Sequence, residues 1–171
     1  MRFHRLLVLA TFVCLCLPAI VQAQSEVTIT QDSCVTVDAD HQRVYFTIIN
    51  HSSNYENLCS FQFTPIPSPA TPECTVIGFG GEPLWVGSPN PDGGIWFGVP
   101  PTEYPFACIS HSADSRGGFY ITIDPGGDCC YEATFTNSMY QTWWTMTWCP
   151  GPCTPTPVEH KTWGTIKQMY N

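Results

Sequence analysis

The sequence has few positive charges, because only six of its 171 residues are Lys or Arg against fourteen Asp and Glu. Nucleic-acid binding through phosphate contacts needs a basic surface, so we expect no nucleic-acid partner. The strict Gly period of collagen is absent, and so is the Glu-, Lys- and Leu-rich composition of a coiled coil. A disordered chain would lack the aromatic residues, which make up 13% of this one. The composition therefore predicts a folded, acidic protein.

Residues 1–23 predict a removable secretory signal. A short basic stretch precedes an apolar run over residues 6–21, and Val21-Gln22-Ala23 fits the small-residue rule for signal-peptidase cleavage. The run is shorter than the roughly 20 residues that span a bilayer, and no later segment is long and apolar enough. We therefore expect a protein that is secreted, extracellular or at the cell surface, with no membrane span after the signal is removed.

Eight cysteines follow the signal, and an even number in an exported chain predicts up to four disulfides. They are Cys34, Cys59, Cys74, Cys108, Cys129, Cys130, Cys149 and Cys153. Zinc is disfavoured, because Cys149 and Cys153 resemble one knuckle and no partner knuckle exists. Neighbouring side chains of an extended chain point to opposite faces, so Cys129 and Cys130 are expected to bond different partners. Neither C-x-x-C nor C-x-x-C-H occurs, and we expect no cofactor.

Alternating apolar and polar residues recur along the chain between clusters of Pro, Gly, Asn and Asp. This pattern predicts an all-β fold, a single antiparallel β-sandwich of about 7–9 strands held by disulfides. The predicted strands cover residues 26–30, 43–50, 59–64, 75–79, 84–86, 95–98, 119–123, 131–136 and 142–148. The strands at 119–123 and 131–136 are joined by Asp124-Pro125-Gly126-Gly127-Asp128, a turn sequence, so we expect them to be neighbours in space.

The sandwich domain is predicted to cover residues 24–149. Residues 150–157 predict a Pro-rich linker, and residues 158–171 predict a short C-terminal helical tail, since their apolar residues recur at spacings of three and four. Two interpretations of the tail remain open, a helix packed on the sandwich and a sorting or docking tag.

Two short stretches resemble the Ig-like sandwich domains of bacterial secreted and surface proteins. Phe46-Thr47-Ile48-Ile49-Asn50-His51-Ser52-Ser53 is similar to their strand and Asn turn, and Ile123-Asp124-Pro125-Gly126 with Phe135-Thr136-Asn137 is similar to their Pro-Gly corner and late strand. The resemblance implies an Ig-like fold, roles in adhesion, spacing and assembly at the cell surface, and no catalytic residues. The chain departs from that family in its many Cys and Trp residues.

Catalysis finds little support in the sequence. His41, His51 and His111 are candidates for a small secreted hydrolase, but no G-x-S-x-G elbow accompanies them. His51 and His111 are interpreted as solvated turn residues, and the protein is predicted not to be an enzyme.

Metal binding and glycosylation have weak signals. Asp92, Asp124 and Asp128 lie in turns and are weak candidates for calcium, but they lack the spaced acidic ladder of an EF-hand, so no metal is expected. Asn50-His51-Ser52 matches the acceptor sequence for N-glycosylation.

The aromatic residues exceed what one small core requires, so some are expected to be exposed. By strand parity Tyr45, Tyr120 and Trp143 lie opposite the predicted core and are candidate binding residues. Exposed aromatic side chains form protein interfaces or stack on sugar rings.

We expect a secreted non-enzymatic protein of surface structure, adhesion or assembly, which self-assembles or binds a surface partner. The alternative is a carbohydrate-binding module. Assembly would use residues 26–30 as a strand added to a neighbouring sheet, or the C-terminal tail.

Overall fold

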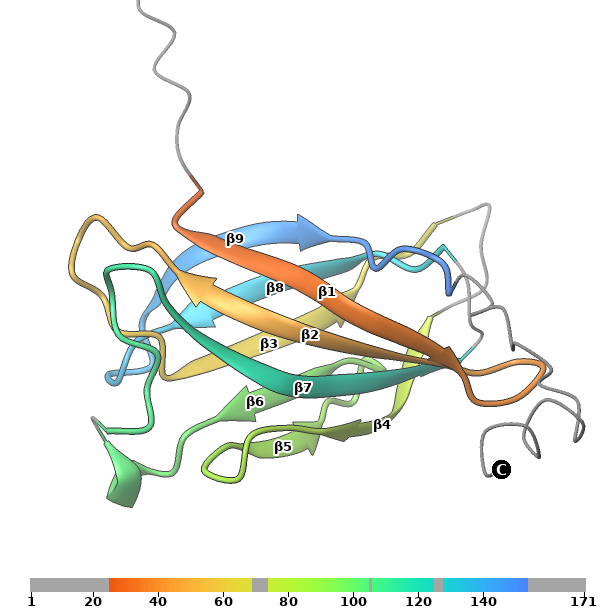
Figure 1. Cartoon of the computed structure of the whole chain (residues 1–171), viewed down its shortest axis with the longest axis horizontal. Coiled ribbons are helices and arrows are strands. Elements are labelled where there is room, and N and C mark those ends of the chain that lie inside the picture. Colours follow the sequence, from red (N-terminus) through yellow and green to blue (C-terminus); the bar gives the residue numbers. More distant parts are fainter. Residues whose placement is uncertain (1–24, 69–73, 105, 125–127, 154–171) are drawn as a thin grey trace, which may run out of the picture.

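The structure is a computed structural model that describes four stretches of the chain, residues 25–68, 74–104, 106–124 and 128–153. Nine strands lie in these stretches, and their loops gather at two opposite ends of the molecule (Figure 1). The expected signal at residues 1–23, the expected helix at residues 158–171 and the second half of the expected linker lie outside the described residues.

The strands form two sheets in which every pair is antiparallel. The four-stranded sheet has the order β1 (Val27–Thr36), β2 (Gln42–Asn50), β7 (Asp114–Asp124), β4 (Thr75–Gly80). The five-stranded sheet has the order β5 (Val86–Pro89), β6 (Ile95–Gly98), β3 (Ser60–Pro65), β8 (Tyr131–Thr136), β9 (Thr142–Trp148). Within the described residues, the one helical turn is η1 (Pro101–Glu103). The prediction of an all-β, two-sheet antiparallel fold is confirmed.

Strand β2 shows how the sequence pattern places the core. Val44, Phe46 and Ile48 are at most 1% exposed, whereas the alternating Tyr45 and Thr47 are half-buried on the outer face. Because successive side chains of a strand point to opposite faces, one face of β2 lies in the core and the other covers the outside of the sheet. The prediction of a central strand here is confirmed, since β2 lies between β1 and β7.

An aromatic cluster fills the space between the two sheets. Phe46 of β2 stacks on Phe119 of β7 with ring centroids 5.7 Å apart, and it meets Phe61 and Phe63 of β3 edge-on. The ring centroid of Trp148 in β9 lies 5.2 Å from that of Phe46. Burial of each such side chain contributes about 1.5–3 kcal/mol, so this cluster is a main source of stability.

Two of the tryptophan side chains belong to the core. Trp85 and Trp148 are only 6% exposed. The buried indole of Trp85 donates a hydrogen bond from Nε1 to the carbonyl of Ala107 at 3.0 Å, which satisfies its polar atom. These two indoles are therefore not among the exposed aromatic side chains.

The expectation that residues 119–123 and 131–136 are neighbours in space is corrected. These residues belong to β7 and β8, and β7 pairs with β2 and β4 whereas β8 pairs with β3 and β9. The chain therefore passes from one sheet to the other between them. Each strand buries one apolar face against the opposite sheet, and such a pattern is the same for a hairpin and for a crossing between sheets.

All eight cysteines from Cys34 onward form disulfides, which confirms the expected number. The pairs are Cys34–Cys153, Cys59–Cys108, Cys74–Cys129 and Cys130–Cys149. Cys129 and Cys130 bond different partners, as predicted. Cys129 joins the residue before β4 of the four-stranded sheet, and Cys130 joins the residue after β9 of the five-stranded sheet. One dipeptide thus holds both sheets.

Four loops meet at one end of the sandwich, on the left in Figure 1. They connect β2 to β3, β4 to β5, β6 to β7 and β8 to β9. This region, called the loop end below, comprises residues 51–59, 81–85, 99–104, 106–113 and 137–141. The β1–β2 and β5–β6 turns lie at the opposite end (Figure 1).

Candidate functional site

Tyr45 and Tyr120, two of the three candidate binding residues, lie side by side on the outer face of the four-stranded sheet. They are cross-strand partners on β2 and β7, and their ring centroids are 5.6 Å apart with planes tilted by 49°. Both side chains are half-buried. Strand register thus brings together two aromatic rings that are 75 positions apart in the chain.

Neighbouring residues cover the ring of Tyr120. The guanidinium carbon of Arg43 lies 4.7 Å from the ring centroid, and Arg43 Nε donates a hydrogen bond to Thr122 Oγ1 at 3.1 Å. A Cβ atom at Gly80 of β4 would lie 2.4 Å from the ring, so the ring rests on the bare glycine backbone. Arg43, Gly80 and Tyr45 therefore occupy the surroundings that a stacking ligand would need.

Trp143, the third candidate, lies in the other sheet and does not face outward. The register of β8 and β9 shifts between Phe135 and Thr136, and Trp143 falls at this irregularity. Its side chain is half-buried against the core, and its indole Nε1 is buried without a hydrogen-bond partner among the described residues. The parity prediction for Trp143 is therefore wrong, because a bulge breaks the alternation of β9. The three candidates do not form one site.

The histidines named for a hydrolase lie apart. His51 and His111 are in the loop end, and His41 is at the opposite end. His111 Nδ1 lies 3.4 Å from Asn57 Oδ1, and its ring meets Tyr55 edge-on with centroids 5.0 Å apart. Neither contact is to a Ser or Cys side chain, so neither builds the nucleophile and base pair that a hydrolase uses.

His41 is the centre of a charged cluster that fixes the β1–β2 turn. Its Nδ1 lies 2.6 Å from Asp38 Oδ2, and its Nε2 lies 3.7 Å from Asp124 Oδ1 at the end of β7. The hydrogen bond with Asp38 raises the pKa of His41 above its usual value. The same bond, followed by one from the backbone N–H of Asp40, lowers the pKa of Asp38. The cluster is a structural contact at the surface.

The weak calcium candidates do not form a metal site in the structure. Asp124 faces His41, and Asp92 accepts a hydrogen bond from the backbone N–H of Gly94 at 2.9 Å. In the described part of the chain, no three His, Cys, Asp or Glu side chains are placed to hold a metal ion. Calcium takes six to eight oxygen ligands, which a single carboxylate does not supply.

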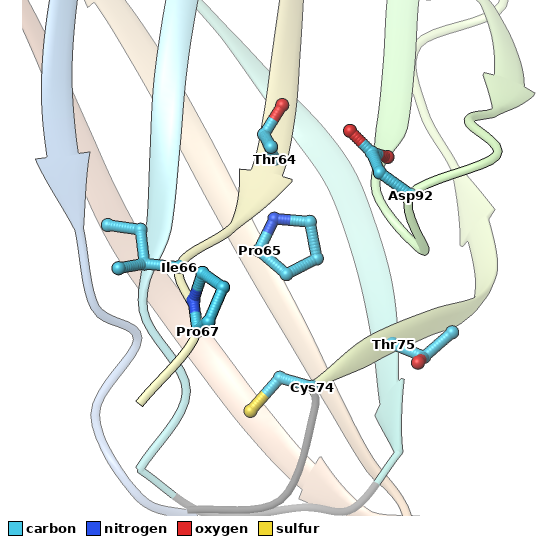
Figure 2. A pocket seen from close by; sticks show the side chains of 7 residues that line it. All are labelled: Thr64, Pro65, Ile66, Pro67, Cys74, Thr75 and Asp92. Atoms are coloured by element: carbon cyan, nitrogen blue, oxygen red, sulfur yellow. The ribbon is translucent and has the colours of Figure 1, made fainter. Parts of the chain in front are cut away.

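A shallow hollow of about 390 Å³ lies at the end opposite the loop end. In Figure 2, Asp92 and Thr75 lie across it from Ile66 and Pro67. Its lining is mostly apolar, and Asp92 is its one ionisable side chain because Cys74 is in a disulfide. A lining with one carboxyl group lacks the carboxylate pair that glycoside hydrolysis uses.

The glycosylation acceptor Asn50 is sealed inside the protein. It is 0% exposed, its Nδ2 donates to the carbonyls of Glu56 at 2.8 Å and Ile109 at 2.9 Å, and its Oδ1 accepts from the N–H of Ser52. A glycan would replace one of the two Nδ2 hydrogens that donate these bonds, and it would have to fit at a side chain that is fully buried, so the folded protein does not present Asn50 for modification.

The loop end carries the most exposed apolar side chains of the described residues. Phe106 is 86% exposed, Tyr55 77%, Met139 68% and Tyr140 55%. Three separate loops contribute them. Sequence reasoning missed these residues, because loops lack the alternation that tells an inner from an outer position and only the topology brings them to one end.

Contacts between the loops hold this surface in place. The Cys59–Cys108 disulfide and paired hydrogen bonds between Leu58 and Ile109, each 2.9 Å, join the β2–β3 and β6–β7 loops. The next two links, Asn137 Nδ2 to Glu56 Oε2 at 3.1 Å and Tyr104 beside Tyr140, reach the β8–β9 loop. Burial, followed by this tyrosine neighbour, raises the pKa of Tyr104 to about 12. The loops form one braced unit.

Backbone strain is concentrated in the same loops. Four residues other than glycine have positive φ in the described chain, and all four lie in the loop end: Tyr55, Ser112, Ala113 and Tyr140, with φ between 58° and 78°. The left-handed region costs an L-residue roughly 1–2 kcal/mol, which is why glycine or asparagine usually occupies it. Two of the four positions instead hold exposed tyrosines.

In the described residues, no helix is long and apolar enough to cross a membrane. A scan of the chain against protein-family models and a search of curated proteins found no match, so the residues of the surfaces above carry the functional argument.

Proposed function

We propose that this chain is a secreted, non-enzymatic extracellular protein that acts in adhesion or assembly by binding a protein partner through its loop end. The observation that carries the proposal is the presence of Tyr55 and Tyr140, exposed aromatic side chains on strained backbone. Residues in strained backbone conformations cluster at functional sites. Aromatic residues held rigidly at the centre of a surface are the residues that dominate protein–protein affinity.

The charge of the loop end indicates the chemistry of the partner. The loops contain Glu56, Glu82 and Glu103 and no Lys or Arg. Arg116 of the adjoining β7 contacts Glu82 at 3.7 Å and adds no free positive charge. The proposed partner surface is therefore an apolar pocket with Lys or Arg at its rim, since opposite charges at the rim favour association and orientation.

Bracing of the loops supports binding as their role. An interface made of mobile loops loses conformational entropy on association, about 0.5–1.5 kcal/mol for each side chain that becomes fixed. The Cys59–Cys108 disulfide and the Leu58–Ile109 pairing hold the backbone before any partner arrives. A preorganised surface of this kind loses less conformational entropy when it binds.

The strand order supports the Ig-like assignment within the proposal. In Ig constant-type domains, strands A, B, E and D face strands C, F and G. Here β1, β2, β7 and β4 face β3, β8 and β9, and the chain visits them in the same sequence. The β5–β6 hairpin is inserted between the strands that correspond to D and E, and it pairs with β3 on the free side of that sheet.

Four disulfides are compatible with an oxidising, extracellular location, because such bonds persist outside the cytosol. Cleavage after residue 23 remains a prediction.

Strand addition at residues 26–30 is less favoured than the loop end as a route to assembly. Residues 27–30 lie in edge strand β1, but the later part of β1 is held to residues 151–153 by Cys34–Cys153 and by the bond from Gly151 N–H to Gln31 Oε1 at 2.7 Å.

Site-specific photo-crosslinking tests the proposal. A photoreactive side chain at residue 106 should yield a discrete protein adduct in the organism that makes the protein. The same group at Asp40, an exposed residue of the opposite end, should not. The double variant Tyr55→Ser, Tyr140→Ser should lose the adduct while remaining folded and fully oxidised. Equal crosslinking at residues 40 and 106, or an adduct that persists in the double variant, would contradict the role of the loop end.

A further inference from the structure

The outer face of the five-stranded sheet carries the aromatic ring of Trp96, which is partly exposed. The indole of Trp96 in β6 lies over Gly98, since a Cβ atom there would be 2.2 Å from Cζ2 and 2.3 Å from Cη2. The ring is half-buried, and it is not among the residues packed against the core. The ring contacts and cation–π contacts among the described residues do not involve Trp96, which distinguishes it from Tyr120. The missing side chain of Gly98 leaves the space that the indole occupies against the sheet.

Trp96 belongs to a row of cross-strand neighbours that runs over all five strands, and the other members of this row are polar. In cross-strand register the row consists of Ser88, Trp96, Gln62, Thr134 and Thr145. At strand spacings of about 4.8 Å it extends roughly 19 Å. The next row holds Val86, Gly98, Ser60, Thr136 and Thr142, and the hydroxyls of Ser60 and Thr136 are hydrogen-bonded to each other.

The chemistry of this face selects among ligand classes. The two rows contain no charged residue, and the row on the other side of Trp96 holds Glu132 between Thr64 and Thr147. This carboxylate disfavours nucleic acid and other anionic polymers. Serine and threonine contribute little to protein hot spots, and here they surround a single aromatic ring. A neutral sugar combines an apolar C–H face, which stacks on an indole, with hydroxyl groups around its edge, which pair with Ser, Thr and Gln side chains.

We propose that this face binds a neutral saccharide chain, with one sugar ring stacked on Trp96 and the neighbouring sugars along the row of Ser88, Gln62, Thr134 and Thr145. The length of the row fits several sugar units rather than one. The site is separate from the loop end, and it does not depend on the protein partner proposed there. Together, the two surfaces would let the protein connect a glycan to a protein.

Affinity electrophoresis of the oxidised protein tests this inference, since a chain of charge −8 migrates well in a native gel. The gels contain β-glucan, xylan or galactomannan as neutral probes, or polygalacturonate as an anionic probe. We expect retardation by at least one neutral probe. Trp96→Ala should weaken that binding about tenfold or more, and Trp96→Phe should weaken it less because a smaller ring remains.

Phe106→Ser is the matched control, because it removes an exposed aromatic ring from the loop end and should leave retardation unchanged. Conversely, Trp96→Ala should leave the photo-adduct of the loop end intact. Unretarded migration in every neutral gel, retardation by polygalacturonate alone, or full retardation of Trp96→Ala would overturn the inference. If Trp96→Ala is not secreted, Gln62→Ala and Ser88→Ala decide the outcome by the same measurement.

Discussion

The two outer faces of the sandwich each hold an aromatic ring that rests on a glycine, yet the two rings are in different situations. Tyr120 lies against Gly80 and is flanked by Tyr45 and Arg43. Trp96 lies over Gly98, and its neighbours in its row are the uncharged polar side chains of Ser88 and Gln62. An aromatic residue on a sheet face is therefore not by itself a binding site. Its neighbours decide whether the ring stabilises the sheet or remains available to a ligand.

Substitution of Gly80 or Gly98 should give the largest difference in stability between the two faces. In Gly80→Ala the new methyl group meets a ring that its neighbours hold in place, and overpacking of this kind costs about 1–3 kcal/mol. In Gly98→Ala the indole can turn toward solvent, so the loss of unfolding free energy should be smaller, while saccharide binding falls. Urea denaturation of both variants measures the difference. Equal losses would show that Trp96 is as constrained as Tyr120.

Removal of either ring should again destabilise the Tyr120 face more than the Trp96 face, but by a smaller difference in unfolding free energy. Tyr120→Ala loses a cation–π contact and a ring pair, together about 1–2 kcal/mol of unfolding free energy. Trp96→Ala should lose less than about 1 kcal/mol, because exposed positions without specific contacts contribute little. Denaturant midpoints of the two purified variants provide the measurement. A larger loss for Trp96→Ala would assign the indole a structural role.

The loop end extends the contrast to backbone strain. Tyr55 has φ of 62°, so Tyr55→Gly should be about 1 kcal/mol more stable than Tyr55→Ala, which keeps the Cβ atom in the left-handed region. Both variants lose the ring, and crosslinking through residue 106 should fall equally in both. Thermal unfolding compares the pair. If the alanine variant is as stable as the glycine variant, strain at this position does not support the binding role.

The smallest expected effect is the pH dependence from His41. Asp38 raises its pKa, so the contribution of this contact is fully present below the ordinary value of 6.5 and is lost as pH rises through the raised pKa. The pKa of Asp38 is lowered, so its contribution is lost only in acid, as pH falls below its ordinary value of 3.8 through the lowered pKa. His41→Gln should flatten the decline in unfolding free energy between about pH 6 and 8. An unchanged slope in urea titrations at these pH values would contradict this assignment.

Much of the fold was predictable from the sequence, because alternation in strands such as β2 reports directly which side chains are buried. The pairing of β7 and β8 was not, since an apolar face looks the same whether the next strand lies beside it or in the opposite sheet. The bulge at Trp143 was also hidden, because a register shift depends on the partner strand and leaves no mark in the local pattern.

The candidate sites were less predictable than the fold. The spacing of Trp96 and Gly98, an aromatic residue two positions before a glycine in a strand, is a local signal for a ring that lies flat on a sheet. Tyr120 and Gly80 carry no such signal, because they are neighbours only through strand pairing. Phe106, Tyr55 and Met139 come from separate loops, and only the complete topology places them together.

The Cys34–Cys153 disulfide has a mechanical consequence. A pulling force applied to the chain before residue 34 and after residue 153 passes through one covalent bond and bypasses the chain between these two residues, whose sequence separation is 119. The two sheets, the loop end and the face around Trp96 all lie within that bypass, apart from the first part of β1. Tension applied along the chain through the segments outside this disulfide therefore does not load either proposed binding surface.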